Sequence, residues 1–92
     1  MTYYHASRNS NLCAAGIQVG QSTSCSIYRE SKHIYVGTLK YIHEQYLKYC
    51  PKGTYYIYEI ETDLQLEPLP AKGQWRTTDI LFPKRVVKSE TV

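Results

Sequence analysis

Two short segments carry residue types suited to recognising a flat, polar ring. Residues 3–7 read Tyr-Tyr-His-Ala-Ser, and residues 33–37 read His-Ile-Tyr-Val-Gly. Each is typical of a short aromatic strand that ends in small residues and brings an imidazole or a phenol to its edge. An aromatic platform beside an imidazole, with backbone that permits close approach, suits a planar nucleobase or a nicotinamide ring. The two segments together predict a ligand site.

Length and composition predict one domain over residues 1–92. A chain of 92 residues buries roughly two thirds of its unfolded surface, which supports a single core. The apolar fraction of 42% includes ten tyrosines, whose hydroxyls need partners, so we expect the core to open onto a wet cleft. The net charge of +3 suits a phosphate-bearing ligand. The basic residues are scattered, so the support for a nucleic-acid surface is weak.

The three cysteines, Cys13, Cys25 and Cys50, are widely spaced and form no CxxC pair. The three histidines do not complete a zinc-binding spacing either, so we expect no metal site. No apolar run is long enough for a signal peptide or a membrane span. We therefore expect a reduced, cytoplasmic protein whose thiols are idle or buried as small hydrophobic groups.

Two helices are predicted. The short one covers residues 11–15, and Gly16 is placed to end it in a left-handed conformation. The main one begins at Thr38 and ends before Pro51. Its apolar residues recur at spacings of three and four, which predicts one apolar stripe: Leu39, Ile42, Tyr46, Leu47, Tyr49 and Cys50.

Five segments have strand-like patterns: residues 2–5, 33–36, 55–61, 74–77 and 84–88. Residues 55–61 alternate strongly and predict a half-buried strand. Pro68, Pro70 and Gly73 predict a loop. Helices toward the front and strands toward the back favour an α+β domain with a largely antiparallel sheet.

The order of these features resembles the ADP-ribosyltransferase fold, in its diphtheria-toxin and poly(ADP-ribose) polymerase branch. That branch has a histidine on its first strand and a tyrosine on a later strand. A second tyrosine follows eleven residues on, which here is Tyr46 after Tyr35. Residues 56–58 through 67–68, and then Trp-Arg-Thr at 75–77, are also similar to the small bacterial rifampin ADP-ribosyltransferases. The resemblance covers most of the chain and implies a split antiparallel sheet with one main and one short helix.

The resemblance implies an NAD site built from both segments. His5 would hydrogen-bond the adenosine-side ribose hydroxyl, the backbone of Ala6 would hold the nicotinamide carboxamide, and Ser7 would shape that turn. Tyr35 and Tyr46 would enclose the nicotinamide ring. On this basis we expect the side chains of His5 and Tyr35 to converge on one pocket, with Tyr46 opposite.

Further site residues follow from the same resemblance. His43 occupies a position where the family often has a serine that touches the carboxamide. Gln74 stands where polymerase-like members have their glutamate; an amide accepts the same hydrogen bond but carries no charge. Rifampin-type members place an acid earlier, where this chain has Asp63 and Glu67. Arg76 is a candidate contact for the pyrophosphate or the acceptor. The predicted catalytic set is therefore His5, Tyr35, Gln74 and Glu67.

The leading hypothesis is a minimal ADP-ribosyltransferase-like protein that binds NAD and transfers ADP-ribose to a macromolecule or a small molecule. A second hypothesis is a non-catalytic nucleotide- or protein-binding module on the same fold, with Gln74 marking lost activity. A third is a small RNA-acting domain, because Tyr, His and Arg also stack on bases and contact phosphates.

Overall fold

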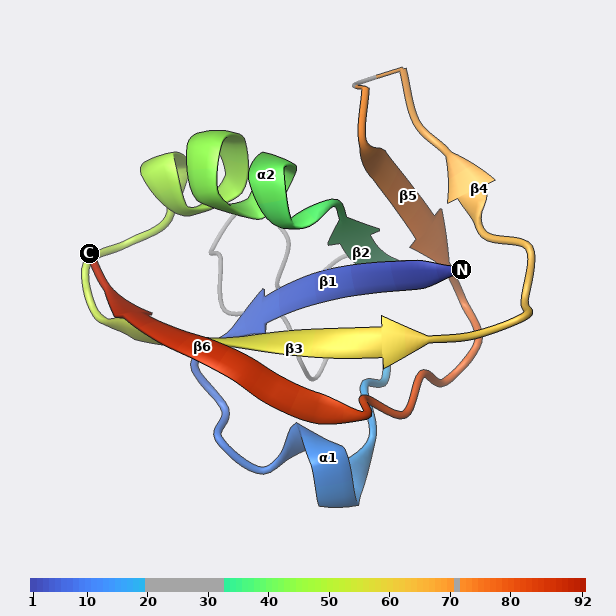
Figure 1. The fold of residues 1–92 in the computed structure, drawn as a ribbon, viewed down its shortest axis with the longest axis horizontal. Coiled ribbons are helices and arrows are strands. Elements are labelled where there is room, and N and C mark those ends of the chain that lie inside the picture. The colour runs from blue at the N-terminus through green and yellow to red at the C-terminus, as the bar shows by residue number, and fades with distance from the viewer. Residues whose placement is uncertain (20–32, 71) are drawn as a thin grey trace.

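The computed structural model describes residues 1–19, 33–70 and 72–92, and these form one α+β unit around a six-stranded antiparallel sheet (Figure 1). The strand order is β4-β5-β2-β1-β3-β6. The strands are β1 Thr2–Ser7, β2 Ile34–Gly37, β3 Thr54–Glu61, β4 Glu67–Pro68, β5 Gln74–Thr77 and β6 Arg85–Thr91. The antiparallel α+β class is confirmed. The one strand missing from the prediction is β4, whose proline is tolerated because β4 is an edge strand.

The main helix is irregular. It consists of α2 Leu39–Tyr41, a π-helical turn η1 Ile42–Tyr46 and a 3₁₀ turn η2 Leu47–Tyr49, together called the helical segment. Thr38 caps it as predicted, because its hydroxyl accepts a hydrogen bond from the Tyr41 amide at 3.0 Å. The amide of Leu47 bonds to the carbonyl of Ile42, five residues back. This wider turn allows both side chains to be buried.

The predicted apolar stripe is correct only in part. Ile42 and Leu47 are buried, whereas Leu39 is 37% exposed and does not belong to the stripe. The side chain of Tyr49 lies outside the described part of the structure. The short helix, α1 Leu12–Ala15, ends at Gly16 as predicted. Gly16 has a positive φ of 80°, but its ψ of 159° is extended, so the predicted left-handed helical cap is wrong.

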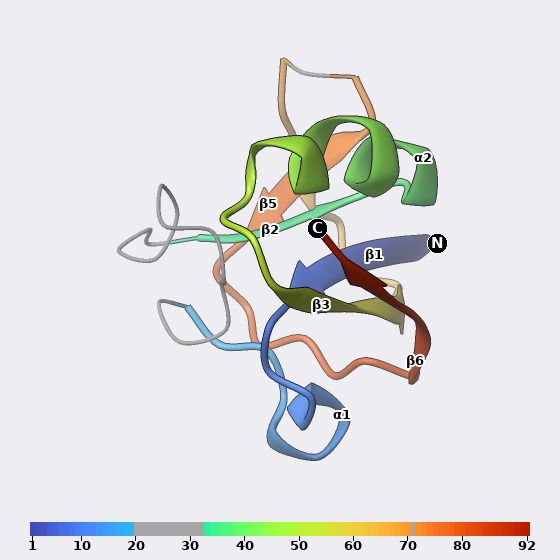
Figure 2. The same ribbon diagram turned by 90° about the vertical axis from the view of Figure 1, so that its left-hand side faces the viewer.

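The sheet has a core on each face, because α1 lies on one side and the helical segment on the other (Figure 1, Figure 2). The face covered by the helical segment is here called the helical face, and its core consists of Ala6, Ile42, Leu47, Tyr55 and Ile57. The opposite face is called the α1 face. Its core consists of Tyr3, Leu12, Ile17, Ile34, Val36, Tyr58, Ile60, Leu66 and Leu81.

Strand β3 contributes to both cores. Tyr55 and Ile57 are buried on the helical face, while Tyr58 and Ile60 are buried on the α1 face. The prediction of a half-buried strand is therefore wrong, because a sheet with cover on both sides buries both sets of alternating residues. No helix of the described residues is long and apolar enough to span a membrane.

The two edges of the sheet differ. One edge is β4, which has only two residues. The other is β6, which has seven residues and pairs with β3 alone. The pairing of β6 with β3 shifts register between Ile57 and Tyr58. Lys84, Arg85 and Lys88 place three cations along or beside this edge.

Candidate functional site

His5 lies at the boundary between two parts of the sheet. Strands β1 and β2 share one registered backbone pair, Tyr4 with Gly37, whereas β1 and β3 share six. The His5 imidazole is 4% exposed, and its Nδ1 lies 2.8 Å from the backbone carbonyl of Tyr35 on β2. In a regular antiparallel ladder a backbone amide would donate to such a carbonyl, and here the His5 side chain bonds to it instead.

This hydrogen bond determines which nitrogen of His5 carries the proton. A carbonyl oxygen can only accept, so Nδ1 must donate. In the neutral ring, Nε2 then carries the lone pair and is an acceptor.

Alternation along the strands places His5 and Tyr35 on different faces. His5 pairs with Tyr58, which belongs to the α1-face core, so His5 lies on that face. Tyr35 precedes Val36, which also belongs to the α1-face core, so Tyr35 lies on the opposite, helical face together with its pairing partner Arg76. The expectation that the two side chains converge above one face of the sheet is therefore wrong. They are connected instead through the His5 side chain and the Tyr35 backbone, between the two strands.

Several other predicted residues share the helical face with Tyr35. Ala6 belongs to its core, and Tyr46 packs against that core from the helical segment. Gln74 on β5 pairs with Gly37 of β2. Gly37 is two residues after Tyr35, so Gln74 and Tyr35 lie on the same face of the sheet. The structure thus brings Ala6, Tyr35, Tyr46 and Gln74 to one side of the sheet.

A row of polar side chains crosses β4, β5 and β2 on this face. Glu67 pairs with Arg76, and Arg76 pairs with Tyr35. Arg76 Nε lies 2.6 Å from Glu67 Oε2, and Nη2 lies 3.1 Å from Oε1, so the ion pair is bidentate. Arg76 also hydrogen-bonds the side chain of Tyr35. The guanidinium hydrogen bonds hold the pKa of Glu67 below its ordinary value, and Glu67 raises the pKa of Arg76.

The row has a consequence for the predicted catalytic acid. Glu67 is already neutralised by Arg76, so it is a counter-ion in this structure rather than an uncommitted carboxylate. His33, which sequence reasoning did not include in the site, adds to the row: its ring centroid lies 6.4 Å from that of Tyr35. His33 lies directly before β2, two residues ahead of Tyr35, and this spacing was the available signal, because residues two apart in an extended chain share a face.

Gln74 is nearly buried, at 7% exposure. Its backbone carbonyl accepts the amide of Leu69, and among the described residues its side-chain amide forms no hydrogen bond. A buried polar side chain is more informative about structure or function than an exposed one, because burial of a polar group is uncommon. In the described part of the chain these are His5, Ser7 and Gln74, all three predicted site residues.

Ser7 ends β1 with a local turn. Its hydroxyl accepts the amide of Asn9 at 3.1 Å, and the side chain is 2% exposed. This is a local serine turn of the kind that ends a strand. It determines the direction in which the chain leaves the joint between β1 and β2.

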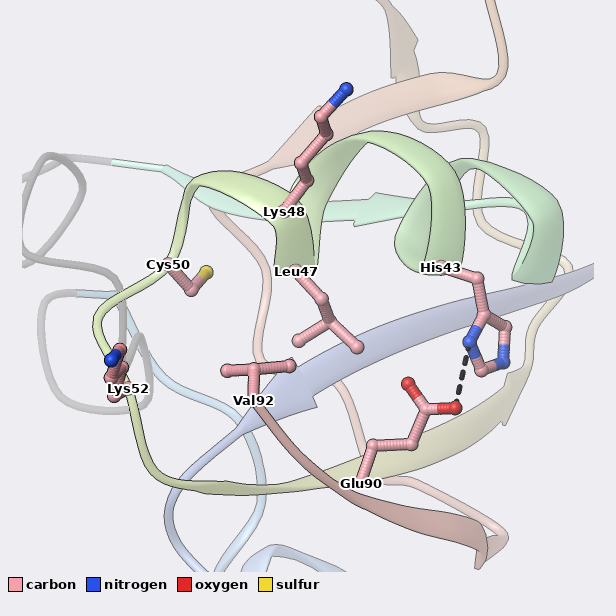
Figure 3. Close-up of a pocket in the computed structure, with 7 residues that line it drawn as sticks. All are labelled: His43, Leu47, Lys48, Cys50, Lys52, Glu90 and Val92. Carbon is pink, nitrogen blue, oxygen red and sulfur yellow. Dashed lines mark ion pairs between the residues drawn. The ribbon is translucent and has the colours of Figure 1, made fainter.

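His43 is not part of this group. Its Nδ1 lies 3.0 Å from Glu90 on β6, at the far edge of the sheet from β5. Figure 3 shows the imidazole pointing toward that carboxylate, at one end of a pocket of about 380 Å³ that also contains Leu47, Cys50 and Val92. A contact between His43 and a ring held by Tyr35 is therefore not supported.

The remaining acids also lie elsewhere. Asp63 lines a pocket of about 390 Å³ beside Tyr3 and Trp75, whose rings pack edge to face on the α1 face. The amide of Asp79 bonds to the hydroxyl of Thr77 in a local turn. Of the two acids that the sequence offers as candidates, Asp63 and Glu67, only Glu67 belongs to the helical face.

The described histidines, cysteines, aspartates and glutamates form no group of three that could hold a metal ion. The expectation of buried thiols is wrong for Cys13, which is exposed, and Cys50 is half-buried with its thiol donating to the Tyr46 carbonyl at 3.2 Å. Cys25 lies outside the described residues.

Comparisons with known proteins found no family, no curated protein and no solved structure that matches this chain.

Proposed function

We propose that this chain is an NAD-binding domain of the ADP-ribosyltransferase type, with its nicotinamide site on the helical face, at the joint between β1 and β2. The observation that carries the proposal is the His5 imidazole that bonds to the Tyr35 carbonyl where the backbone ladder is reduced to one pair. A joint of this kind is compatible with the split sheet that the sequence resemblance implies. It also connects two residues to which that resemblance assigns the cofactor.

Residue types on the helical face support the cofactor assignment. Tyr35 and Tyr46 supply aromatic rings from the sheet and the helical segment, on the same face as Ala6. Their rings would hold the nicotinamide, and the Ala6 backbone would bind its carboxamide. His5 lies on the α1 face and would act through its hydrogen bond to the Tyr35 carbonyl rather than by direct contact with the cofactor. When bound, NAD supplies a cleavable glycosidic bond between nicotinamide and ribose.

The contacts support binding more strongly than turnover. Gln74 is buried on the correct face but carries no charge, and Glu67 is paired with Arg76. A positive charge developing on the ribose would therefore meet no dedicated carboxylate. We expect slow or absent NAD hydrolysis by this domain. Transfer of ADP-ribose to a small-molecule or macromolecular acceptor is the activity that an additional carboxylate would permit.

The second candidate, a binding module without catalysis, is favoured by the same Glu67–Arg76 ion pair. Glu67 can serve as an acid or as a counter-ion, and the bidentate geometry favours the second role. The RNA-acting alternative has less support, because Arg76, Lys84, Arg85 and Lys88 all pair with carboxylates.

The test is calorimetric titration with NAD, ADP-ribose and nicotinamide. Tyr35→Ala should weaken NAD binding by about 1–3 kcal/mol, as loss of a stacking wall does. His5→Ala should weaken NAD binding, because it removes the hydrogen bond that joins β1 to the Tyr35 backbone. The matched control is Phe82→Ala, which removes an aromatic ring that is 65% exposed outside the site. Absence of binding by the wild type at millimolar concentrations of all three compounds would refute the assignment.

A further inference from the structure

A pocket of about 430 Å³ lies between the start of the helical segment and the turn before β5. Its walls come from both elements: Thr38, Lys40, Tyr41, Glu44, Gln45, Lys72 and Gly73. None of these residues belongs to the NAD assignment. The volume is within the range of pockets for small organic ligands.

The pocket rests on a well-defined contact between two elements. The amide of Thr38 donates to the carbonyl of Gly73 at 3.0 Å. Gly73 has a φ of 84°, and a Cβ added there would lie 3.2 Å from the Thr38 hydroxyl and 3.6 Å from Tyr41 Cβ. Because Gly73 has no side chain, its backbone can lie close to Thr38 and Tyr41, and no Cβ enters the pocket between them.

The charges in the wall favour an anion. Two lysines line the pocket, and among the described residues neither Lys40 nor Lys72 forms an ion pair. Lys84 and Lys88, beside and on the edge strand β6, are both paired with glutamates. One acid, Glu44, shares the pocket, so the wall has a net positive charge.

The uncharged part of the wall favours a ring. Tyr41 is half-buried, with part of its ring against Gly37, where an added Cβ would lie 2.8 Å from Tyr41 Cδ1. Gln45 adds an amide that can both donate and accept. An aromatic wall, an amide and two lysines together suit a base or nucleoside attached to a phosphate.

We propose that this pocket binds a nucleoside monophosphate group, with the phosphate between Lys40 and Lys72 and the ring system against Tyr41. The group is either a free mononucleotide or the phosphorylated end of a nucleic-acid strand; both present the same chemistry. The inference rests on this pocket alone and does not require NAD to bind.

The experiment is a titration of isotope-labelled protein with adenosine monophosphate, adenosine and inorganic phosphate, followed by NMR. The amide signals of Thr38, Tyr41 and Gly73 should shift with adenosine monophosphate. Adenosine, which lacks the phosphate, should bind about tenfold more weakly or worse. Equal affinity for adenosine and adenosine monophosphate, or shifts confined to other segments, would overturn the proposal.

A matched pair of variants tests the two lysines. Lys40→Ala/Lys72→Ala should weaken adenosine monophosphate binding about tenfold or more, because each charged hydrogen bond is lost. Lys84→Ala/Lys88→Ala removes the same charge from the region of β6 and should leave the affinity unchanged. Equal losses in both would indicate a general charge effect and overturn the proposal. Well-dispersed spectra of each variant establish that the fold is retained.

Two further measurements distinguish a free mononucleotide from a strand end, and this pocket from the proposed NAD site. A 5′-phosphorylated trinucleotide that binds more tightly than adenosine monophosphate identifies a strand end, and the reverse order identifies a free mononucleotide; both support the phosphate pocket. Tyr35→Ala should leave adenosine monophosphate binding intact. Binding of adenosine monophosphate without any NAD binding would refute the proposed function while supporting this pocket.

Discussion

The two halves of the sheet are built differently. In the half formed by β1, β3 and β6, each neighbouring pair shares six registered residue pairs. In the half formed by β2, β5 and β4, the pairs share four and two, and one pair joins the halves. The first half buries β3 on both faces, whereas the second carries the polar row of Glu67, Arg76 and Tyr35 across its surface.

The difference indicates a division of roles. Long ladders and burial on both faces make the β1–β3–β6 half the stable part of the molecule. The shorter half can carry exposed polar groups and a reduced ladder because less of the core depends on it. Site residues from the two halves meet where His5 bonds to the Tyr35 carbonyl.

The largest effect is expected in the long half, at Tyr58. This residue is fully buried; its hydroxyl accepts the Leu12 amide and donates to the Asn9 carbonyl, and burial raises its pKa. Tyr58→Ala should lower the free energy of unfolding by about 3–5 kcal/mol. The same truncation at the half-buried Tyr35 should cost about 1 kcal/mol. Urea unfolding measures both, and similar losses would contradict the division of roles.

Tyr58→Phe separates the two contributions. It keeps the ring volume but leaves the Leu12 amide without its acceptor, so we expect a loss of about 1–3 kcal/mol. A loss below that range would mean that packing alone accounts for the stability at this position.

The second effect concerns catalysis in the short half. Gln74→Glu places a carboxylate on the helical face, where a group preorganised toward developing positive charge is worth about 3–4 kcal/mol, or a hundred- to thousand-fold in rate. We expect NAD hydrolysis, measured by nicotinamide release, to rise by up to that factor. Glu67→Gln is the matched control and should leave the slow wild-type rate unchanged. A Gln74→Glu protein that binds NAD but is no faster would favour the binding module.

The smallest effect is the pH response of two carboxylates, one in each half. Glu67 beside Arg76 and Glu90 beside Lys88 both have a pKa below the ordinary 4.5. A depressed pKa in the folded state stabilises the fold above the unfolded value, and this contribution is lost as the pH falls through the folded value. NMR titration should show Arg76→Ala raising the pKa of Glu67 alone, and Lys88→Ala that of Glu90 alone. Cross-effects would mean that the halves are coupled.

The sequence located β1, β3 and β5, whereas β6 continues to Thr91, three residues beyond its predicted end. Alternation of aromatic and β-branched residues located β1 and β3, and Thr38 with Pro51 bounded the helical segment. These features are local, so periodicity and capping residues reveal them. The π-helical turn could not be predicted in this way, because it depends on the sheet beneath Ile42 and Leu47.

The site was predicted less completely. Ala6, Tyr35, Tyr46 and Gln74 do share a face, but His5 reaches Tyr35 through its backbone, which no spacing rule reveals. Strand pairing also decided the partner of Glu67, because Arg76 is nine residues away and becomes its neighbour only when β4 forms. His43 was assigned by position and is held instead by Glu90, from a strand at the far edge.

The outer edge formed by β6 has a consequence for how the protein behaves when crowded. A seven-residue strand with one neighbour leaves a row of backbone donors and acceptors that a second sheet can pair with. Here the charged side chains of Lys84, Arg85 and Lys88 stand along or beside this edge, where they disfavour pairing with a second strand, and the register shift opposite Tyr58 interrupts the flat surface that such pairing requires. We therefore expect the protein to resist fibril-like stacking at high concentration. Removal of those charges should promote it.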